Sequence, residues 1–234
     1  MFINYDVIVV GGGHAGAEAA AAAANMGSNT LLITMNIQLI GNMSCNPAIG
    51  GIAKGQIVRE IDALGGYSGI ITDKTMIQFR MLNKSKGPAM WSPRAQSDRI
   101  RFTEEWRLTL EAIPNLDLFQ DTVTSLLIKG DKVIGVCTIM GLKIKSKSVI
   151  LTNGTFLNGV IHIGNKKING GRISEKSSLG ITEQLKNLGF SYGRMKTGTS
   201  PRVDGRSLNY SKMFKQQGDN PSKQFSYLNT INLN

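Results

Sequence analysis

The sequence predicts an α/β protein in which a Rossmann-like, dinucleotide-binding unit is joined to an antiparallel β-meander. Two observations predict the first part. An apolar run at 5–10 leads directly into a glycine-rich turn, and an alanine-rich helical segment and a second apolar run at 29–34 follow it. A third observation predicts the meander, because apolar and polar residues begin to alternate at Leu116.

The first strand, helix and strand form one recognisable unit. "YDVIVV" at 5–10 is a nearly continuous apolar run with β-branched residues, which is typical of a buried parallel strand. "AEAAAAAANMG" at 17–27 contains strong helix formers and ends at Gly27, a natural position just past a helix C-terminus. "NTLLIT" at 29–34 is the next strand. The unit spans about thirty residues, as a nucleotide-binding βαβ unit does.

Two longer helices are expected next. "GIAKGQIVREIDALGG" at 51–66 predicts a helix with Ile57, Ile61 and Leu64 on one face. "RAQSDRIRFTEEWRLTLEAIPNL" at 94–116 predicts a second helix that is charged on its outer side and ended by Pro114.

The alternating segment at 116–154 predicts an antiparallel hairpin or a three-stranded meander. Turn signals at 129–131 and 140–141 divide it, and "SVILTNG" at 148–154 returns to a buried strand. One more helix is expected within 177–189. No periodicity is evident beyond Pro201, and the chain has no internal repeats.

Composition excludes several classes of protein. The longest apolar run, near 19–24, is far too short to span a bilayer, and the N-terminus lacks the charged and apolar regions of a signal peptide. We therefore expect a cytoplasmic protein without membrane contact. Cys45 and Cys137 cannot build a disulfide framework, and neither has zinc-ligand spacing, so no metal is implied. Cys137 lies in an alternating strand and is expected in the core.

The net charge of +11 is unevenly distributed along the chain. Residues 1–50 contain no Lys or Arg, whereas residues 151–234 contain twelve against four acidic residues. A basic half of this kind often marks a surface that binds nucleic acid. The alternative is an ordinary solvated basic surface.

The glycine-rich turn carries the strongest motif. Gly11, Gly12, Gly13, His14, Ala15 and Gly16 contain the pattern G-x-G-x-x-G directly between a strand and a helix. The first glycine permits the tight turn, the second lets the backbone approach a pyrophosphate, and the third lets the helix pack on the strand. Free N–H groups and the helix dipole then hold the phosphates. This context predicts a bound dinucleotide rather than an empty glycine turn.

One residue of the usual dinucleotide site is missing. The acidic residue that commonly binds a ribose at the end of the second strand is replaced by Thr34-Met35-Asn36. Asn36 could hydrogen-bond a hydroxyl, but less strongly than a carboxylate. These residues alone leave FAD and NAD open. We expect His14 to be fixed near phosphate or solvent without a titrating role.

Cys45 occupies a loop of small residues, "MSCNPAIGG" at 43–51. If Asn46 caps a helix with Pro47 at its first position, Cys45 lies just outside the helix N-terminus, where the dipole favours a thiolate. This placement predicts a nucleophile. The alternative is a small residue packed under a cofactor.

Two basic segments, 83–101 and 193–206, combine cations with glycine, hydroxyl groups and a tryptophan. Such segments suit phosphate binding along a flexible nucleic acid, although ordinary solvated charges remain the alternative. The residues concerned are Lys84, Lys86, Trp91, Arg94, Arg99, Arg101, Arg194, Lys196, Arg202 and Arg206.

Several strings together resemble one family of tRNA-modifying flavoenzymes, the MnmG or GidA family. They are "DVIVVGGGHAGAEAA", "MSCNPAIGGIAKGQIVREIDALGG", "IQFRMLNKSKGPA", "VILTNGTFLNGVIHIG", "GGR" and "KTGTSPR", in order from Asp6 to Arg202. The strings SCNPAIGG and NKSKGPA are far more specific than the glycine pattern. "MWSPRAQ" departs from the family pattern, which affects individual RNA contacts.

The resemblance implies a FAD-binding domain of the glutathione reductase-like class. It further implies that FAD, NADH and 5,10-methylenetetrahydrofolate serve to attach an aminomethyl or carboxymethylaminomethyl group to C5 of the wobble uridine of tRNA. Gly11 to Gly16 would bind the FAD pyrophosphate, Val123 and Ser178 would make further FAD contacts, and Cys45 would be catalytic. The implied partners are tRNA and the GTPase MnmE, with a homodimer and, for the intact protein, a heterotetramer.

Members of this family are several hundred residues longer, so the resemblance implies an N-terminal fragment. Residues 1–203 would then be the N-terminal part of the FAD-binding domain, and residues 204–234 the beginning of an inserted second domain. Such a fragment is expected to lack complete catalysis. Two alternatives remain: a folate-dependent tRNA (uracil-5-)methyltransferase, and a non-catalytic module that binds RNA or a partner.

Overall fold

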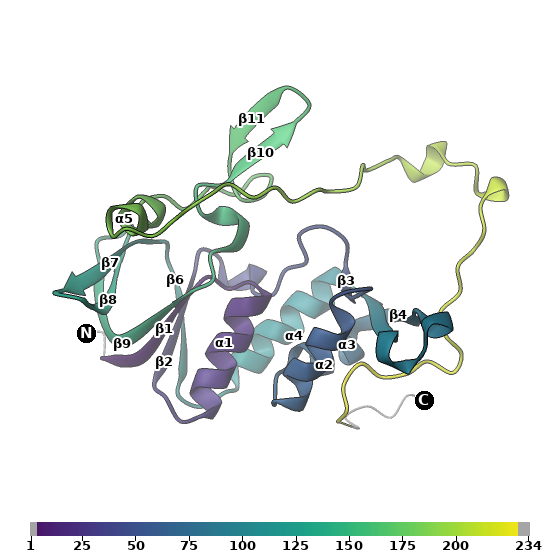
Figure 1. Cartoon of the computed structure of the whole chain (residues 1–234), viewed down its shortest axis with the longest axis horizontal. Helices are drawn as coiled ribbons and strands as arrows, with labels where there is room; N and C mark the ends of the chain where they lie inside the picture. The colour runs from purple at the N-terminus through teal and green to yellow at the C-terminus, as the bar shows by residue number, and fades with distance from the viewer. Residues whose placement is uncertain (1–3, 229–234) are drawn as a thin grey trace.

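The computed structural model describes residues 4–228 and is built on a central sheet with strand order β6-β2-β1-β9-β8-β7. Strands β1 (Tyr5–Val10), β2 (Thr30–Thr34) and β6 (Leu116–Gln120) are parallel to one another, and β1 also pairs in parallel with the second half of β9 (Lys143–Leu151). The predicted β1–helix–β2 unit is confirmed. The carboxyl ends of these parallel strands all lie at one edge of the sheet (Figure 1).

The predicted meander consists of β7 (Val123–Lys129), β8 (Lys132–Thr138) and the first half of β9, which pair antiparallel. The turns at 129–131 and 140–141 are where the sequence predicts them. The predicted meander began one strand too early, because β6 instead pairs in parallel with β2. This pairing has a physical reason. Every residue of β2 is buried, so the backbone N–H and C=O groups on the side of β2 away from β1 need partners, and β6 supplies them.

Two hydrophobic cores lie on opposite faces of the parallel strands. Helix α1 (His14–Asn25) covers one face with buried alanines and packs with α4 (Arg99–Glu111), whose Phe102 and Trp106 are fully buried. The meander and α5 (Ile181–Asn187) cover the other face, where Ile8 meets Val136 and Ile181 in one cluster. The alanines let α1 approach the sheet closely, which positions its N-terminus at the carboxyl ends of the strands.

A smaller antiparallel sheet has the strand order β3-β5-β4 and lies beside α2 (Gly55–Ala63) and α3 (Ser68–Thr75). Its strands are β3 (Ala48–Gly50), β5 (Ser92–Ser97) and β4 (Met76–Leu82). The prediction of one helix over 94–116 is wrong in its first part, because Ser92–Ser97 pairs between the two other strands. The helix starts only at Arg99, where the Asp98 carboxylate accepts hydrogen bonds from the N–H groups of Ile100 and Arg101.

The helix predicted at 51–66 is shorter, and its apolar face does not meet the core. Ile57 is 54% and Leu64 90% exposed, whereas Gly55 and Asp62 are buried. Positive φ angles of +82° at Gly50 and +110° at Gly51 prevent the helix from starting earlier. Asp62 is buried because its carboxylate accepts a hydrogen bond from the N–H of Tyr227, far along the chain.

The remaining elements are short. Strands β10 (Val160–Ile163) and β11 (Lys166–Asn169) form a hairpin that projects from the body (Figure 1). Six 3₁₀ turns complete the described residues: η1 (Ile37–Leu39), η2 (Lys84–Lys86), η3 (Pro88–Met90), η4 (Gly154–Phe156), η5 (Gly205–Ser207) and η6 (Tyr210–Lys212). Cys137, expected in the core, is half-buried on β8. No helix within residues 4–228 is long and apolar enough to cross a membrane.

After α5 the chain runs along the molecule as an extended segment and returns to the β4 side, as Figure 1 shows in green and yellow. The returning part, 219–228, is tied down by carboxylates. Asp73 accepts hydrogen bonds from the N–H groups of Phe225 and Ser226, at 2.6 and 2.8 Å, and the Phe225 ring is fully buried against Phe79. Phe225 therefore belongs to the core formed by α1, α3 and β4, and it anchors the returning segment there.

Replacing Asp73 by alanine should detach the returning segment. Two buried N–H groups would lose their acceptor, and each unsatisfied buried donor costs about 1–3 kcal/mol. We expect faster amide hydrogen exchange at Phe225 and Ser226 in Asp73→Ala, while β1 and β2 exchange as in the unaltered chain. Equal protection of residues 219–228 in both proteins would contradict this account.

Candidate functional site

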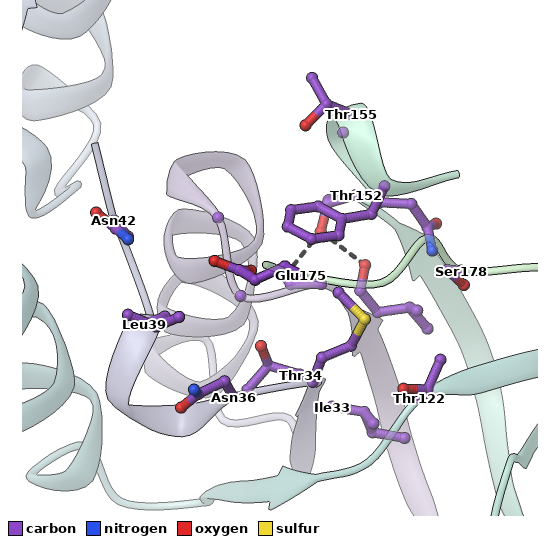
Figure 2. Close-up of a pocket in the computed structure, with 18 of the residues that line it drawn as sticks. Ile33, Thr34, Asn36, Leu39, Asn42, Thr122, Thr152, Thr155, Glu175 and Ser178 are labelled. Carbon is purple, nitrogen blue, oxygen red and sulfur yellow. Dashed lines mark hydrogen bonds between the residues drawn. The ribbon is translucent and has the colours of Figure 1, made fainter. Parts of the chain in front are cut away.

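A cavity of about 290 Å³ opens at the carboxyl ends of the parallel strands. The glycine turn after β1, the loop after β2, the connection from β6 to β7 and the turn after β9 all line it. Figure 2 shows Asn36 and Leu39, which follow β2, together with Thr122, Thr152 and Ser178, which come from the other segments around the cavity. Ligands of open α/β sheets bind at this edge, so the topology itself marks the site.

The glycine turn has the geometry that its motif predicts. Gly11 has a φ of +108°, and a Cβ atom there would lie 2.7 Å from the carbonyl oxygen of Thr152. A Cβ at Gly16 would overlap with the carbonyl oxygen of Gly11 and lie 2.7 Å from the Thr152 hydroxyl, so α1 packs on the turn without space for a side chain. Gly13 is different, because nothing lies within 4 Å of a Cβ built there. The space beside Gly13 is therefore open, and Gly13 is part of the cavity wall.

The predicted cofactor residues divide into two sets. Gly11, Gly12, Gly13 and His14 line the cavity together with Val123 and Ser178, which come from the opposite wall. The Ser178 hydroxyl donates a hydrogen bond to the carbonyl of Val123 at 3.3 Å, and this bond joins that wall to the start of the meander. Ala15 and Gly16 do not line the cavity: Ala15 is exposed on the first turn of α1, and Gly16 is buried under it.

His14 is held by the protein at the entrance of α1. Its Nε2 lies 2.9 Å from the carbonyl oxygen of Gly41, and its ring meets Phe102 edge-on. Part of the residue is exposed, but the removal of the ring from water lowers the pKa of His14, against the opposing effect of the Gly41 carbonyl. The lowered pKa favours the neutral imidazole beside the turn, and the absence of a titrating role for His14 in function stays a prediction.

This lowered pKa has a consequence for stability. Below about pH 6.5 the unfolded chain binds a proton at His14 that the folded chain does not yet bind, so the free energy of unfolding decreases as pH falls. We expect His14→Gln to reduce that decrease in urea unfolding measured between about pH 7 and pH 5. His162→Gln, on the exposed part of β10, is the matched control. An unchanged pH dependence in His14→Gln would contradict the prediction.

Polar atoms without partners also line the cavity. Asp121 Oδ2 and Asn153 Oδ1 are both inaccessible to solvent and have no hydrogen-bond partner. Buried polar atoms are rarely left unpaired, and both of these belong to residues of the cavity wall, where a ligand with hydrogen-bond donors would pair with them. Asn36, the residue expected to replace the missing ribose-binding acid, is already engaged: its Oδ1 accepts a hydrogen bond from the N–H of Gln38 at 2.9 Å and caps η1.

The predicted surroundings of Cys45 are wrong in one respect. Asn46 and Pro47 do not start a helix, since Ala48–Gly50 forms β3 against β5 and α2 begins only at Gly55. The helix N-terminus expected directly after Cys45 is therefore absent. Pairing with β5, which is distant in sequence, overrides the local capping signal.

Cys45 instead meets a segment more than 150 residues away. Its Sγ lies 3.5 Å from the hydroxyl of Thr199, and its carbonyl oxygen accepts hydrogen bonds from Arg99 Nη2 at 2.8 Å and Arg202 Nη2 at 2.7 Å. Arg202 also donates to Asn46 Oδ1. Two guanidinium groups thus hold the loop at one carbonyl. Ser44, the preceding residue, lines the cavity, so the Cys45 loop borders the candidate dinucleotide site.

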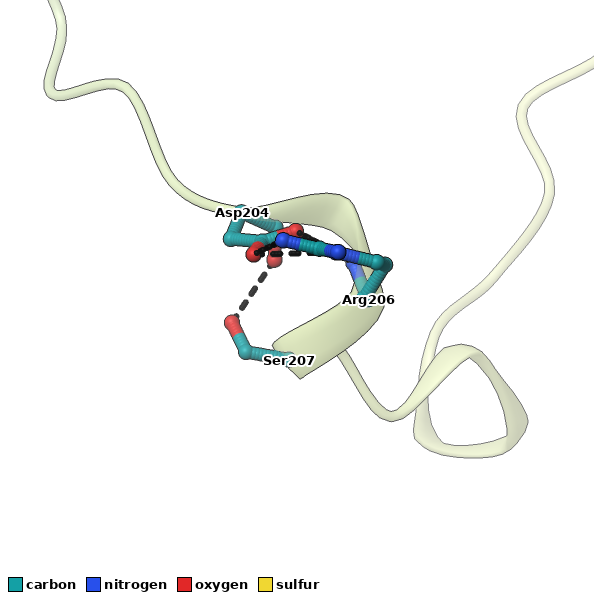
Figure 3. Close-up of polar contacts among 3 residues, drawn as sticks. All are labelled: Asp204, Arg206 and Ser207. Atoms are coloured by element: carbon teal, nitrogen blue, oxygen red, sulfur yellow. Dashed lines mark hydrogen bonds and ion pairs between the residues drawn. The ribbon is translucent and has the colours of Figure 1, made fainter.

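Three arginines of segment 193–206 already have hydrogen-bond partners within the protein. Arg206, in η5, is paired with both carboxylate oxygens of Asp204, which caps that turn (Figure 3). Arg194 donates to the carbonyl of Asn158, and Arg202 holds the Cys45 loop. Hydrogen bonds to carbonyls leave the positive charge in place, whereas the Asp204 carboxylate offsets that of Arg206. Arg206 is therefore the weakest of these candidates for a phosphate contact.

Residues 6–233 match the model of the family described as Glucose inhibited division protein A, GidA. The chain belongs to the GidA family. This membership confirms the resemblance that the motifs indicate, and the α/β fold agrees with it.

Named relatives and solved structures are similar over nearly the whole chain. A protein of Karelsulcia muelleri (strain GWSS), named tRNA uridine 5-carboxymethylaminomethyl modification enzyme MnmG, is 72% identical over 100% of this chain and 38% of its own length. Aquifex aeolicus GidA in its form I crystal has a TM-score of 0.93 and 49% identity, covering 97% of this chain and 38% of that one. The GidA-related protein from Thermus thermophilus is more distant, with a TM-score of 0.57 and 25% identity over 81% of this chain and 70% of that chain.

The chain therefore spans a little over a third of the length of the MnmG relative and of Aquifex aeolicus GidA. Sequence reasoning missed three features of the site: Asp121, Thr199 and the use of Arg99 and Arg202 on the Cys45 loop. Asp121 had no usable signal, because the alternation from Leu116 predicts an antiparallel strand, and only the parallel pairing of β6 with β2 places Asp121 at the ligand-binding edge. The other contacts have none either, since they join segments far apart in the sequence.

Proposed function

We propose that this chain is the FAD-binding N-terminal part of an enzyme that modifies C5 of the wobble uridine in tRNA. It would add an aminomethyl or carboxymethylaminomethyl group; the names of the relatives give the carboxymethylaminomethyl modification of tRNA uridine for those proteins. The observation that carries the proposal is the position of the Cys45 loop next to a cavity built on a dinucleotide-binding turn.

FAD fits the residues present. Gly13 leaves open space where the backbone meets the N-terminus of α1, which suits a pyrophosphate, and Asp121 and Asn153 present unpaired acceptors deeper in the cavity. Gly11, Gly12 and His14 would line the phosphate end, and Val123 and Ser178 the opposite wall. The bound flavin would supply the redox chemistry of the reaction. This chain would bind and orient the flavin.

Cys45 is the proposed nucleophile. C5 of uracil reacts poorly with an electrophile unless its electron density is raised. A thiolate that adds to C6 leaves the electron pair on C5, which can then attack a one-carbon electrophile; loss of the C5 proton with departure of the thiolate restores the ring. The clamp of Arg99 and Arg202 on the Cys45 carbonyl would hold the loop during these steps.

The remaining components are proposed for the longer protein. NADH would reduce the flavin and 5,10-methylenetetrahydrofolate would supply the one-carbon unit. tRNA and the GTPase MnmE would be the partners of a homodimer that assembles into a heterotetramer. Residues 1–203 and 204–234 remain the proposed division between the FAD-binding domain and the start of an inserted domain, with 219–228 docked on the former.

The first experiment is the visible absorption spectrum of the purified chain, recorded before and after FAD is added and the excess removed. A retained flavin band supports the proposed cofactor site. Absence of flavin from the chain, together with its absence from the longer protein, would contradict that site.

A second experiment separates the proposed reaction from its alternatives. Mass spectrometry of tRNA nucleosides from a reconstituted reaction of the longer protein should detect the aminomethyl or carboxymethylaminomethyl group. A 5-methyl product formed without the GTPase would indicate a folate-dependent methyltransferase instead. Salt-sensitive tRNA binding with no flavin and no product would indicate an RNA-binding module.

A further inference from the structure

The end of β2 cannot supply a ribose-binding carboxylate. Met35 and Asn36 occupy that place, and the Asn36 oxygen is used to cap η1. The adjacent loop is also fixed from outside, because the N–H of Ile37 donates to Oε1 of Gln120 at 3.0 Å. A charged ribose acceptor for a dinucleotide in this cavity would therefore come from another element.

Asp121 lies directly beside that place. Its backbone N–H donates to the carbonyl of Thr34, the last residue of β2, at 2.9 Å, so it follows β6 at the same edge of the sheet. The side chain lines the cavity and the residue is only 8% exposed. Its Oδ1 accepts a hydrogen bond from the N–H of Thr122 at 2.6 Å, which fixes the carboxylate, while Oδ2 is buried and unpaired.

The other acid of the cavity is already neutralised. Glu175 forms an ion pair with Arg172 at 2.9 Å, and the Arg172 guanidinium also stacks on the Phe156 ring. Asp121 has no ion pair among the described residues. A buried carboxylate oxygen without a donor is costly, and a ligand hydroxyl placed there would remove that cost.

We propose that Asp121 recognises the adenosine ribose of the bound dinucleotide and accepts hydrogen bonds from its hydroxyls. The proposal rests on the proposed FAD site. In the usual dinucleotide site, a carboxylate after the second strand binds the ribose. In this chain, Asp121 after the neighbouring strand β6 would supply that carboxylate. Asp121 is thus a specificity residue: an acceptor with negative charge favours a free vicinal diol and repels a phosphate on the ribose.

The test measures FAD affinity by flavin fluorescence in the full chain. The comparison ligand is an FAD analogue whose adenosine ribose lacks both hydroxyls. The unaltered chain should bind FAD about 10- to 100-fold more tightly than the analogue, as expected for a hydrogen bond to a charged acceptor. Asp121→Asn, which replaces the free acceptor by a donor at almost the same volume, should bind both ligands equally.

Two further variants control the result. Asp121→Ala removes the acceptor without adding a donor and should also lose the discrimination. Glu175→Gln changes the paired acid of the same cavity and should retain it. A Tm measured without ligand confirms that each variant folds.

The outcomes separate this inference from the function on which it rests. Discrimination lost in both Asp121 variants and kept in Glu175→Gln supports the role of Asp121. Discrimination that persists in Asp121→Asn, or equal binding of the two ligands by the unaltered chain, overturns that role and leaves the FAD site intact. An unaltered chain that binds neither ligand overturns the role together with the FAD site in this chain.

Discussion

Gly13→Val should fold normally and lose at least about 100-fold in FAD affinity, which corresponds to about 2.7 kcal/mol. The backbone at Gly13 has a φ of −75° and a ψ of −174°, an extended conformation that valine adopts readily. Nothing in the protein lies within 4 Å of the new Cβ. The added methyl groups would therefore occupy only the space proposed for the pyrophosphate. Flavin titration and a ligand-free Tm measure the two effects separately.

Gly16→Ala is the matched contrast within the same turn. Its Cβ would overlap with the carbonyl oxygen of Gly11, so α1 must shift away from β1. Overpacking of this kind costs about 1–3 kcal/mol, and a clash with backbone lies at the upper end. We expect a lower Tm in Gly16→Ala and an unchanged Tm in Gly13→Val. Flavin binding retained by Gly13→Val would show that the phosphates lie elsewhere.

The second large effect concerns Cys45. In the longer protein, Cys45→Ser should reduce the formation of modified wobble uridine by roughly a thousandfold or more, because a hydroxyl is a far weaker nucleophile than a thiolate. Bound FAD and tRNA affinity should not change, since Cys45 does not line the cavity and its carbonyl still accepts from Arg99 and Arg202. Nucleoside mass spectrometry and flavin absorbance provide the two measurements.

Cys137→Ser is the control for this variant. Cys137 is half-buried on β8, and its Sγ donates a hydrogen bond to the carbonyl of Thr138 at 3.7 Å. We expect near-normal modification from it. Near-normal modification from Cys45→Ser would remove Cys45 from the mechanism. A stable adduct between Cys45 and tRNA containing 5-fluorouridine would indicate addition to C6, and its absence in an active enzyme would direct attention to the one-carbon unit.

The elements that follow from short-range sequence patterns were predicted well. The β1–turn–α1–β2 unit, the turns of the meander and the glycine motif each depend on neighbouring residues, because strand burial, helix propensity and φ > 0 are local properties. The errors occurred where distant strands compete with a local signal. Asn46-Pro47 resembles a helix start, and Arg94–Ser97 resembles helix, yet both lie in the sheet of β3, β4 and β5.

The sequence by itself determined the fold class, the family and the place of the glycine turn, because the glycine pattern and the SCNPAIGG string are read along consecutive residues. Only the tertiary structure decided what surrounds Cys45 and which acid faces the cavity. Thr199 and Arg202 reach the Cys45 loop across more than 150 residues, and Asp121 reaches the cavity because β6 pairs beside β2. Such contacts arise from strand order and chain return, which depend on the packing of the whole core and leave no pattern in neighbouring residues.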